Sequence, residues 1–361
     1  MHDMKQSTAF YFALGRPLSP IYSLAMRLRE TLYRRGVLRS YRLAAPVVSV
    51  GNLTLGGSGK TPMVQYLARL LQDNGFHPAI ISRGYGGRAK GAINVVSDDK
   101  SLLLDAEQAG DEPRFLAETL PGVPVLTGIV RRLPAQRAVE MGADVLLLDD
   151  GFQHLQIKRD VNLVLFNTDR LAGNSRVFPG GDLREPVAAL KRATGFVMTG
   201  VHAGNRERAD RFADLLRHRF PGIPVVQAGY GVEGPVRLAA SGILEPAAAD
   251  ILVQHPLFAF CGIAHPESFR QTLIAQGAVL AGFHPLDDHQ RYSSAVIERL
   301  ANRARQSGAQ NLITTEKDLV KLAPHVEALS LPVFGLRMRV EAEEPLARNI
   351  LSAVRSWSGH D

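Results

Sequence analysis

A glycine-rich loop between a buried strand and an amphipathic helix constrains the fold more than any other feature of the sequence. The apolar run 46–50 (PVVSV) predicts a strand, and it leads directly into GNLTLGGSGKTP at 51–62. Residues 63–71 then follow a helical pattern, with four apolar side chains on one face. Strand, glycine-rich loop and helix in this order are the context of a phosphate-binding P-loop. The chain is therefore expected to fold as an α/β protein around a nucleotide site.

The loop offers the groups that hold ATP and Mg²⁺. Its glycines leave room for phosphate oxygens beside the backbone amides. Lys60 is expected to reach the β- and γ-phosphates, and the Thr61 hydroxyl to bind Mg²⁺. Thr54 stands where the usual pattern G-x-x-x-x-G-K-[ST] has its first glycine, and a chance turn without a nucleotide is the alternative that the flanking elements disfavour. The predicted nucleotide-binding residues are Thr54, Leu55, Gly56, Gly57, Ser58, Gly59, Lys60 and Thr61.

A second buried strand ends in two carboxylates, which a P-loop needs as a partner for the metal. The run 145–148 (VLLL) predicts this strand, and Asp149 and Asp150 follow it. One or both are expected to hold Mg²⁺, directly or through water, and the sequence does not assign which. The segment continues as DDGFQH, whose His154 either contacts the substrate or completes a turn. Ligands of open α/β sheets bind at this carboxyl edge of the strands.

Four further polar clusters contain candidate functional residues. In SRGYGG, Arg83 belongs to a loop that either approaches a ligand or forms an ordinary turn. In GDEP, Asp111 either caps a helix or accepts a proton from an attacking hydroxyl. FPGGDLREP supplies Arg184 and Glu185, and arginine is well suited to bind phosphate on either ligand. In the DDH cluster, His289 precedes a predicted helix, which by itself favours a capping role.

Strands and helical patterns alternate along the chain, which predicts a parallel α/β sheet. The predicted strands lie at 79–81, 123–126, 145–148, 163–166, 196–198, 257–261, 279–282, 312–314 and 333–336. A stretch rich in Gly, Pro and Ala interrupts this order and indicates a linker or hairpin. The predicted organisation is a basic amphipathic arm at 1–44, a P-loop domain at 45–228, the linker or hairpin at 229–250 and a smaller α/β domain at 251–361.

Net charge is concentrated at the N-terminus. The whole chain carries +7, while residues 1–43 hold eight basic and two acidic residues, so they contribute +6 and the other 318 residues +1. A nearly neutral body argues against a nucleic-acid-binding protein, which would spread Lys and Arg over its main domain. The single Cys excludes a disulfide framework and any Cys-rich zinc site. The basic surplus therefore points to a partner that meets the N-terminal arm.

Between residues 20 and 35 the arm has the pattern of a basic amphipathic helix. Ile21, Leu24 and Leu28 recur at helical spacing, whereas Arg27 and Arg34 fall on the opposite side. No run of apolar residues approaches the length of a membrane span. Such a helix either lies in the headgroup plane of an anionic membrane or packs its leucine stripe on the protein's own core. The pattern alone slightly favours packing.

Several motifs occur together in one order: GNLTLGGSGKTP, SRGYGG, GDEP, DDGFQH, PGGDLREP, GIAHPESF, DDHQRYS and TTEKD. With them the chain resembles the tetraacyldisaccharide 4'-kinases, the inner-membrane kinases of lipid A biosynthesis. The resemblance covers nearly the whole length after residue 18, and it includes the threonine at position 54. Thr54 is thus a point of agreement with the family.

The resemblance implies a function and roles for individual residues. It implies ATP-dependent phosphorylation of the 4'-hydroxyl of a tetraacylated glucosamine disaccharide 1-phosphate, by a peripheral protein at the cytoplasmic face of the bacterial inner membrane. Asp111 then matches the proposed catalytic base and His289 its partner, in place of the capping roles. Lys60 and Asp150 match further catalytic groups. The substrate-binding candidates are Arg83, His154, Arg184 and Glu185.

The same resemblance shifts the interpretation of the arm toward an anionic membrane surface, because an acylated substrate does not leave the bilayer cheaply. The alternative from another class is a membrane-surface P-loop ATPase that uses the nucleotide as a switch. Such proteins commonly carry an additional Lys early in the loop, and none occurs at 51–59.

Overall fold

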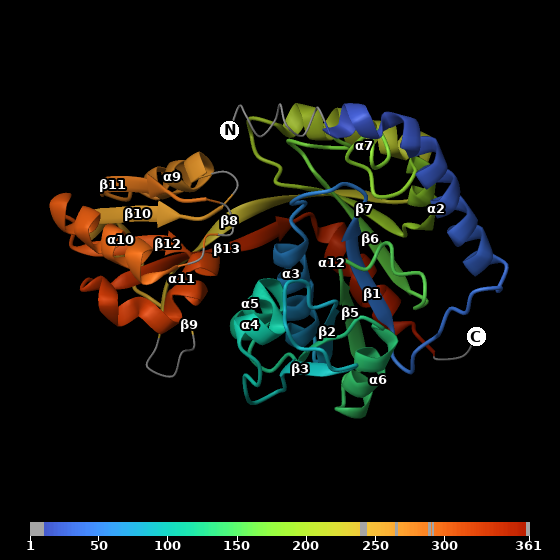
Figure 1. Ribbon diagram of the computed structural model, residues 1–361, viewed down its shortest axis with the longest axis horizontal. Coiled ribbons are helices and arrows are strands. Elements are labelled where there is room, and N and C mark those ends of the chain that lie inside the picture. The colour runs from blue at the N-terminus through green and yellow to red at the C-terminus, as the bar shows by residue number, and fades with distance from the viewer. Residues whose placement is uncertain (1–10, 239–243, 264–265, 288–289, 291, 359–361) are drawn as a thin grey trace. The chain divides into compact units, whose positions relative to one another are not determined.

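The computed structural model describes residues 11–238, 244–263, 266–287, 290 and 292–358. They divide into two compact units, one made of 1–230 with 340–361 and the other of 231–339. Figure 1 shows that helices and strands alternate in both units. The predicted P-loop α/β fold is confirmed.

The first unit is built on a sheet of almost entirely parallel strands. β1 (Val47–Asn52) lies at its centre, between β5 (Val145–Asp149) and β6 (Val161–Asn167). On the β5 side, the next strands are β2 (Pro78–Ser82), β4 (Val125–Thr127) and the antiparallel edge strand β3 (Asn94–Ser97). On the β6 side, the next strands are β7 (Gly195–Thr199) and β8 (Val225–Leu238). Every residue of β1, β2, β5 and β7 is buried, as expected of strands covered on both faces.

Helices cover this sheet, and α3 places the P-loop against it. The helices of the first unit are α2 (Ser19–Arg34), α3 (Lys60–Asp73), α4 (Ala106–Ala109), α5 (Asp111–Thr119), α6 (Arg132–Glu140), α7 (Arg206–Arg219) and α12 (Glu344–Arg355). On α3, Met63, Leu67 and Leu71 are fully buried in the same core as Val48 and Leu147 of the sheet. This apolar packing fixes the start of α3, and with it Lys60, at the end of β1.

The second unit contains its own parallel strands, β10 (Leu257–Cys261), β11 (Leu280–Pro285), β12 (Asn311–Thr315) and the first part of β13 (Val333–Ala342). Its helices are α8 (Ile251–Gln254), α9 (Pro266–Ala275), α10 (Ser294–Gln306) and α11 (Glu316–Leu322). A short strand, β9 (Leu244–Pro246), pairs antiparallel with the end of β8. A separate apolar cluster that includes Leu257, Leu273 and Ile313 forms the core.

The C-terminal segment differs from the expected domain boundaries. The sequence placed 251–361 in the smaller domain, whereas residues 340–361 belong to the first unit. The reason is apolar burial: Leu346, Ile350 and Val354 of α12 join the core of the first unit beside Val226. The stretch 229–250, expected as a linker or hairpin, contains the antiparallel pair of β8 and β9, in agreement with the hairpin alternative. β8 and β13 each run from one unit into the other.

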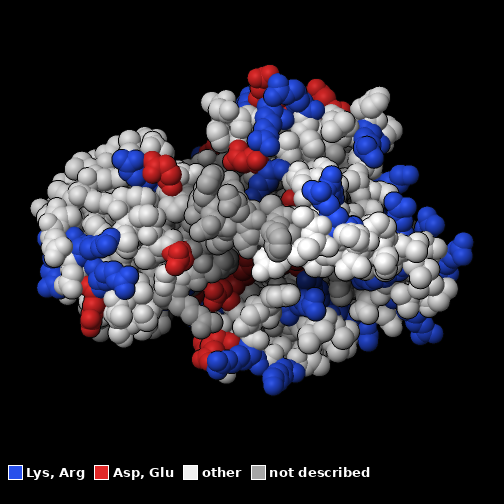
Figure 2. Space-filling model, turned by 45° about the horizontal axis from the view of Figure 1, so that its top comes forward, with Lys and Arg blue, Asp and Glu red and all other residues white. Residues whose placement is uncertain are grey.

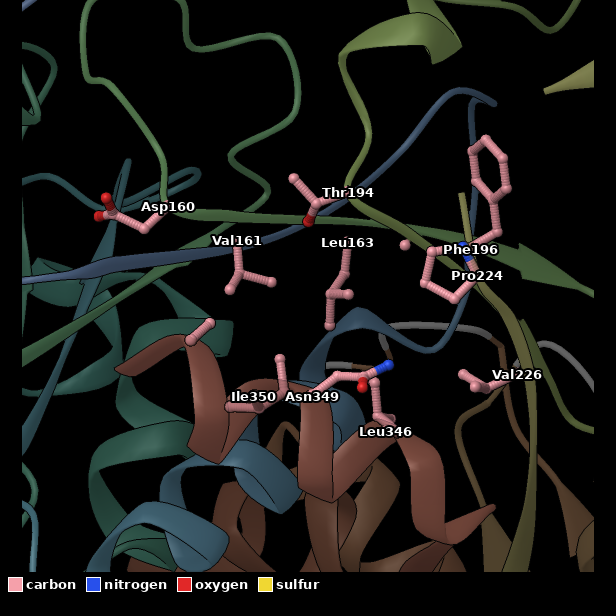
Figure 3. A pocket seen from close by; sticks show the side chains of 12 residues that line it. Asp160, Val161, Leu163, Thr194, Phe196, Pro224, Val226, Leu346, Asn349 and Ile350 are labelled. Carbon is pink, nitrogen blue, oxygen red and sulfur yellow. The ribbon is translucent and has the colours of Figure 1, made fainter. Parts of the chain in front are cut away.

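A cavity of about 290 Å³ lies beside α12 in the first unit (Figure 3). It is bordered by Val161 at the start of β6, Gly195 at the start of β7 and Pro224 just before β8. Parallel strands begin at the edge opposite to the one where they end, so this cavity is on the far side of the sheet from the P-loop. It is therefore not a candidate for the nucleotide site.

The N-terminal helix α2 turns its apolar stripe outward. Ile21, Leu24 and Leu28 are 66%, 67% and 57% exposed, and no residue of α2 is fully buried. The alternative in which these leucines pack on the protein's own core is therefore wrong. No helix in the described part of the chain is long and apolar enough to cross a membrane.

Candidate functional site

The P-loop adopts a conformation that requires glycine at two positions. Gly56 and Gly59 have φ values of +100° and +76°, and Gly59 is the residue before the first turn of α3. A Cβ on Gly59 would clash with the hydroxyl of Tyr230, and one on Gly56 with the Arg170 guanidinium. The Thr199 hydroxyl at the end of β7 donates to the Ser58 carbonyl at 2.9 Å. The loop is thus held from a strand two positions away in the sheet.

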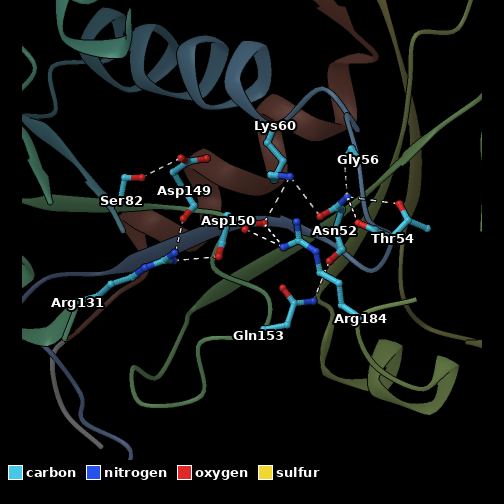
Figure 4. Close-up of polar contacts among 10 residues, drawn as sticks. All are labelled: Asn52, Thr54, Gly56, Lys60, Ser82, Arg131, Asp149, Asp150, Gln153 and Arg184. Carbon is cyan, nitrogen blue, oxygen red and sulfur yellow. Dashed lines mark hydrogen bonds and ion pairs between the residues drawn. The ribbon is translucent and has the colours of Figure 1, made fainter. Parts of the chain in front are cut away.

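Asn52, the last residue of β1, connects the P-loop to its lysine (Figure 4). Its buried side-chain amide donates to the Thr54 carbonyl at 2.8 Å, and its Oδ1 accepts from Lys60 Nζ at 3.3 Å. Thr54 is 9% exposed and forms an isolated β-bridge with Leu183. A residue with extended backbone pairing fits this position, which accounts physically for Thr54 where most P-loops have glycine.

Asp150 carries two cationic partners. Its carboxylate lies 3.5 Å from Lys60 Nζ, and both of its oxygens accept from Arg184 Nη1, at 2.9 and 2.8 Å. Burial alone would raise the pKa of Asp150, but the charges of Lys60 and Arg184 outweigh it and hold the pKa below its usual range. The φ of Asp150 is +48°, a conformation that L-residues rarely adopt. This backbone conformation at the end of β5 directs the Asp150 carboxylate toward Lys60.

Asp149 has the opposite electrostatic environment. Its side chain is fully enclosed, and its described hydrogen-bond partner is the Ser82 hydroxyl at 3.2 Å. Burial, followed by the negative charges of Glu112 and Asp150, raises the pKa of Asp149 to about 6, against smaller opposing effects of Arg131 and Lys60. A buried carboxylate beside two other acids is electrostatically suited to a divalent cation.

Arg131 holds the backbone of both aspartates. Its buried guanidinium donates from Nη1 to the carbonyls of Asp149 and Asp150, at 2.8 and 2.9 Å. Burial lowers the pKa of Arg131, against the raising effect of the two carboxylates. Because these contacts involve carbonyl oxygens, Arg131 does not compete with other groups for either carboxylate.

The donor set fits Mg²⁺ bound together with a nucleotide. In the described residues, no three or more acidic, His or Cys side chains form a ready metal cage. Mg²⁺ does not need one, because it commonly takes one or two carboxylates and completes its shell with phosphate oxygens and water. Asp149, Asp150 and the Thr61 hydroxyl at the start of α3 are the protein groups that would hold it.

The other predicted residues have varied surroundings. His154 is half-buried, and burial together with nearby arginines lowers its pKa to about 3, so the imidazole is neutral at physiological pH. Its Nε2 is buried and has no hydrogen-bond partner in the described chain. Arg83 is exposed, with its guanidinium over the Tyr85 ring. Glu185 is 3% exposed and pairs with Arg192 and Arg29, so its carboxylate positions other residues.

Asp111 begins α5 and is exposed. Gly110, with φ +92°, occupies the N-cap position, and Asp111 is the first residue of the helix. The N-cap residue is therefore Gly110 and not Asp111. His289 lies outside the described residues, and so does the predicted pairing of the two side chains.

Sequence reasoning missed several residues that shape the site, although one signal was available for most of them. Asn52, Ser82 and Thr199 are each the last residue of a predicted or observed parallel strand, on β1, β2 and β7. The rule that ligands bind at the carboxyl edge would have selected all three. Arg131 precedes α6 and carries no comparable signal.

Comparison with known proteins finds one family throughout the chain. The family model described as "Tetraacyldisaccharide-1-P 4'-kinase" matches residues 11–355. The tetraacyldisaccharide 4'-kinase of Desulfotalea psychrophila is 45% identical over 98% of this chain and 99% of its own. That of Syntrophus aciditrophicus is 42% identical over 93% of this chain and 91% of its own.

A solved structure agrees with these relatives. It is the "apo" form of LpxK from Aquifex aeolicus in complex with ATP, at 33% sequence identity and a TM-score of 0.76. The match covers 94% of this chain and 98% of that one.

Proposed function

The chain belongs to the tetraacyldisaccharide 4'-kinase family, and from this premise we propose that it transfers the γ-phosphoryl group of ATP to the 4'-hydroxyl of a tetraacylated glucosamine disaccharide 1-phosphate. The observation that carries the proposal is the meeting of Lys60, Asp150 and Arg184 at the carboxyl edge of the sheet. A P-loop lysine and an arginine beside a strand-end carboxylate are the groups that phosphoryl transfer requires.

Positioning and charge neutralisation account for most of the chemistry. Lys60 and Arg184 would contact phosphate oxygens, and Arg184 Nε is buried without an acceptor in the described chain, so it remains available to one. The P-loop amides from 54 to 61 would hold the β-phosphate. Mg²⁺, held by Thr61 and by Asp149, Asp150 or both, supplies further neutralisation of the phosphate charge when bound.

A proton acceptor must face the attacking sugar hydroxyl. We assign this role to Asp111, whose carboxylate is exposed at the start of α5, with His289 as its partner through the family resemblance. Arg83 and His154 are assigned to the substrate, because Arg83 directly follows Ser82 at the end of β2 and His154 belongs to the DDGFQH segment that follows β5. Glu185 serves the site indirectly, because its buried carboxylate holds Arg192 and Arg29.

The location of the reaction follows from the substrate and from α2. The acylated acceptor resides in a bilayer, and α2 presents Ile21, Leu24 and Leu28 outward. Figure 2 shows Lys and Arg side chains with hardly any acidic ones on the right-hand part of the visible face. A basic helix with an exposed apolar stripe suits binding to an anionic membrane surface. The protein would therefore act peripherally, at the cytoplasmic face of the inner membrane.

One experiment tests the activity. The protein is incubated with γ-labelled ATP, Mg²⁺ and the tetraacylated disaccharide 1-phosphate in detergent. We expect the label to appear on the lipid. A label that stays on ATP or appears only as free phosphate would instead favour the nucleotide-switch ATPase.

The base assignment needs its own variant. Asp111→Asn should abolish transfer and leave ATP binding near normal, because the amide cannot accept the proton. Glu107→Gln, on exposed α4, is the matched control and should transfer at the wild-type rate. Unchanged turnover by Asp111→Asn would remove the assignment.

A further inference from the structure

Helix α2 has a second face, which is polar and turned toward the protein. Ser19, Tyr22, Arg29 and Glu30 are partly buried on this face, in contrast to the exposed stripe on the other side. The Ser19 hydroxyl donates to the Val177 carbonyl and accepts from the Gly180 amide, both at 2.8 Å. This inward face therefore binds the FPGGDLREP segment directly.

A first route leads from α2 to Asp150. The Tyr22 hydroxyl donates to the Arg184 carbonyl at 3.1 Å, and the Tyr22 ring meets the Phe178 ring edge to face, 5.6 Å between centroids. Arg184 in turn forms its two short hydrogen bonds with Asp150. Tyr22 thus fixes the main chain of the residue whose side chain holds Asp150.

A second route leads from α2 to Lys60. Arg29 Nη2 donates to the Gln153 carbonyl at 3.1 Å, and Gln153 Nε2 donates to the Asn52 carbonyl at 2.9 Å. Asn52 Oδ1 accepts from Lys60. Both routes therefore end at the Lys60–Asp150 ion pair, whose contacts with Asn52 and Arg184 are drawn in Figure 4.

The charges around Arg29 tie the two segments together. Arg29 Nη1 lies 3.8 Å from Glu185 Oε1, and Glu185 also binds Arg192, which in turn pairs with Glu30 of α2 at 3.1 Å. The Glu185 carboxylate is 3% exposed, so it needs these cations to offset its desolvation. The inward face of α2 is therefore part of an ion network around the buried Glu185 carboxylate, beside the site.

We propose that Tyr22 and Arg29 are positioning residues for phosphoryl transfer, through which α2 orients Arg184 and Gln153 and thereby the Lys60–Asp150 pair. The helix then serves two tasks on two faces: the outward stripe meets the membrane, and the inward face supports the phosphate site. This inference rests on the proposed kinase function.

A matched pair of charge variants separates the two faces. Arg29→Gln and Arg27→Gln each remove one positive charge from α2, but Arg27 is exposed and forms no ion pair with any residue that the structure describes. Rates are measured with the lipid acceptor dispersed in a nonionic detergent, so that no anionic membrane contributes. Binding to phosphatidylglycerol vesicles is measured separately.

We expect Arg29→Gln to lower kcat/KM for ATP roughly tenfold and Tyr22→Phe roughly threefold, from the usual value of the hydrogen bonds lost. Arg27→Gln should keep the wild-type rate in detergent. Arg27→Gln should lose vesicle affinity, because its charge is exposed, whereas Arg29→Gln should lose less, because Arg29 is on the inward face and pairs with Glu185. Arg29→Lys should recover part of the rate, since the cation remains near Glu185.

Equal rates for Arg29→Gln and Arg27→Gln in detergent would overturn the inference. If Arg29→Gln does not fold, Tyr22→Phe tests the inference instead, because it removes one hydroxyl and keeps the ring contact with Phe178. A wild-type rate for Tyr22→Phe would then overturn it. Absence of lipid phosphorylation by the wild-type protein would instead contradict the proposed function, so the two failures are distinguishable.

Discussion

Each unit buries an aspartate beside a parallel strand, and the two carboxylates have very different surroundings. Asp318, in the first turn of α11 after β12, accepts from the Gly262 amide at 2.9 Å and from the Thr315 hydroxyl at 2.8 Å. Asp149, at the end of β5, accepts only from Ser82 at 3.2 Å among the described residues, and it lies near Glu112 and Asp150. Two neutral donors meet Oδ2 of Asp318, whose Oδ1 has no hydrogen-bond partner in the described chain, whereas neighbouring negative charges oppose the ionisation of Asp149.

The difference indicates what each carboxylate is for. A buried charge that receives good hydrogen bonds from neutral donors ties loops together, and Asp318 joins Gly262 to the start of α11. A buried charge with weak hydrogen bonding and acidic neighbours lowers the stability of the ligand-free protein. Such a group suits a ligand that compensates it, which for Asp149 would be the divalent cation that we propose to bind with ATP.

The largest expected effect is on catalysis. Asp149→Asn should lower kcat by on the order of 10²-fold or more, because it removes a negative charge from the metal site. The measurement is the initial rate of lipid phosphorylation at saturating ATP over a range of Mg²⁺ concentrations. Asp73→Asn, exposed at the end of α3, is the control. A kcat within twofold of wild type would show that Asp149 does not belong to the metal site.

The same substitution should have the opposite effect on stability. The pKa of Asp149 is raised from 3.8 to about 6, so its ionisation destabilises the fold as pH rises through this window. At pH 7 the penalty is at most about 3 kcal/mol, from 1.36 kcal/mol for each pKa unit. Asp149→Asn should therefore raise Tm of the ligand-free protein at pH 7, with a smaller gain at pH 5. A rise in Tm of the same size at pH 5 and pH 7 would show that the ionisation of Asp149 is not its cause.

Asp318→Asn should destabilise the protein, in contrast to Asp149→Asn. Both donors bind Asp318 Oδ2, so in the Asn variant they keep at best a neutral acceptor, and the new NH2 group takes the place of the buried Oδ1, which has no hydrogen-bond partner in the described chain. The expected cost is about 1 to 3 kcal/mol. Urea unfolding of the ligand-free protein at pH 7 measures the difference. Lys317→Gln, one residue earlier, controls for a change of charge in the first turn of α11. If Asp318→Asn and Asp149→Asn changed the free energy of unfolding in the same direction, the comparison between the two aspartates would fail.

Much of the fold could be predicted from the sequence, because buried parallel strands appear as continuous apolar runs and a P-loop has a fixed order of strand, glycine-rich loop and helix. The run 257–261 was predicted with the bounds that β10 has. The edge strand β3 was missed, since Asn94–Ser97 is half-buried and short. Residues of α12 were placed in the wrong unit, because an amphipathic pattern shows that a helix packs but not on which core.

The candidate site likewise has features that the sequence predicted and features that it did not. Lys60, Thr61, Asp149 and Asp150 were predicted from motif and strand order, which set backbone position. The opposite pKa shifts of the two aspartates were not predictable, because they depend on which side chains from β2, α5 and the 176–185 loop surround each carboxylate. For the same reason the sequence could not show that Glu185 is buried and paired with Arg192 and Arg29.

The smallest expected effect comes from Ser82→Ala. It removes the hydroxyl that donates to Asp149 Oδ2 at 3.2 Å and introduces no new charge. With that donor gone, the ionised form of Asp149 is less favourable and its pKa rises further. The acid limb of the kcat/KM profile for ATP, which reports groups of the free enzyme, should move to higher pH, so that kcat/KM falls roughly threefold near pH 6 and less at pH 8. A uniform loss at both pH values would mean that Ser82 acts on the strand end and not through Asp149.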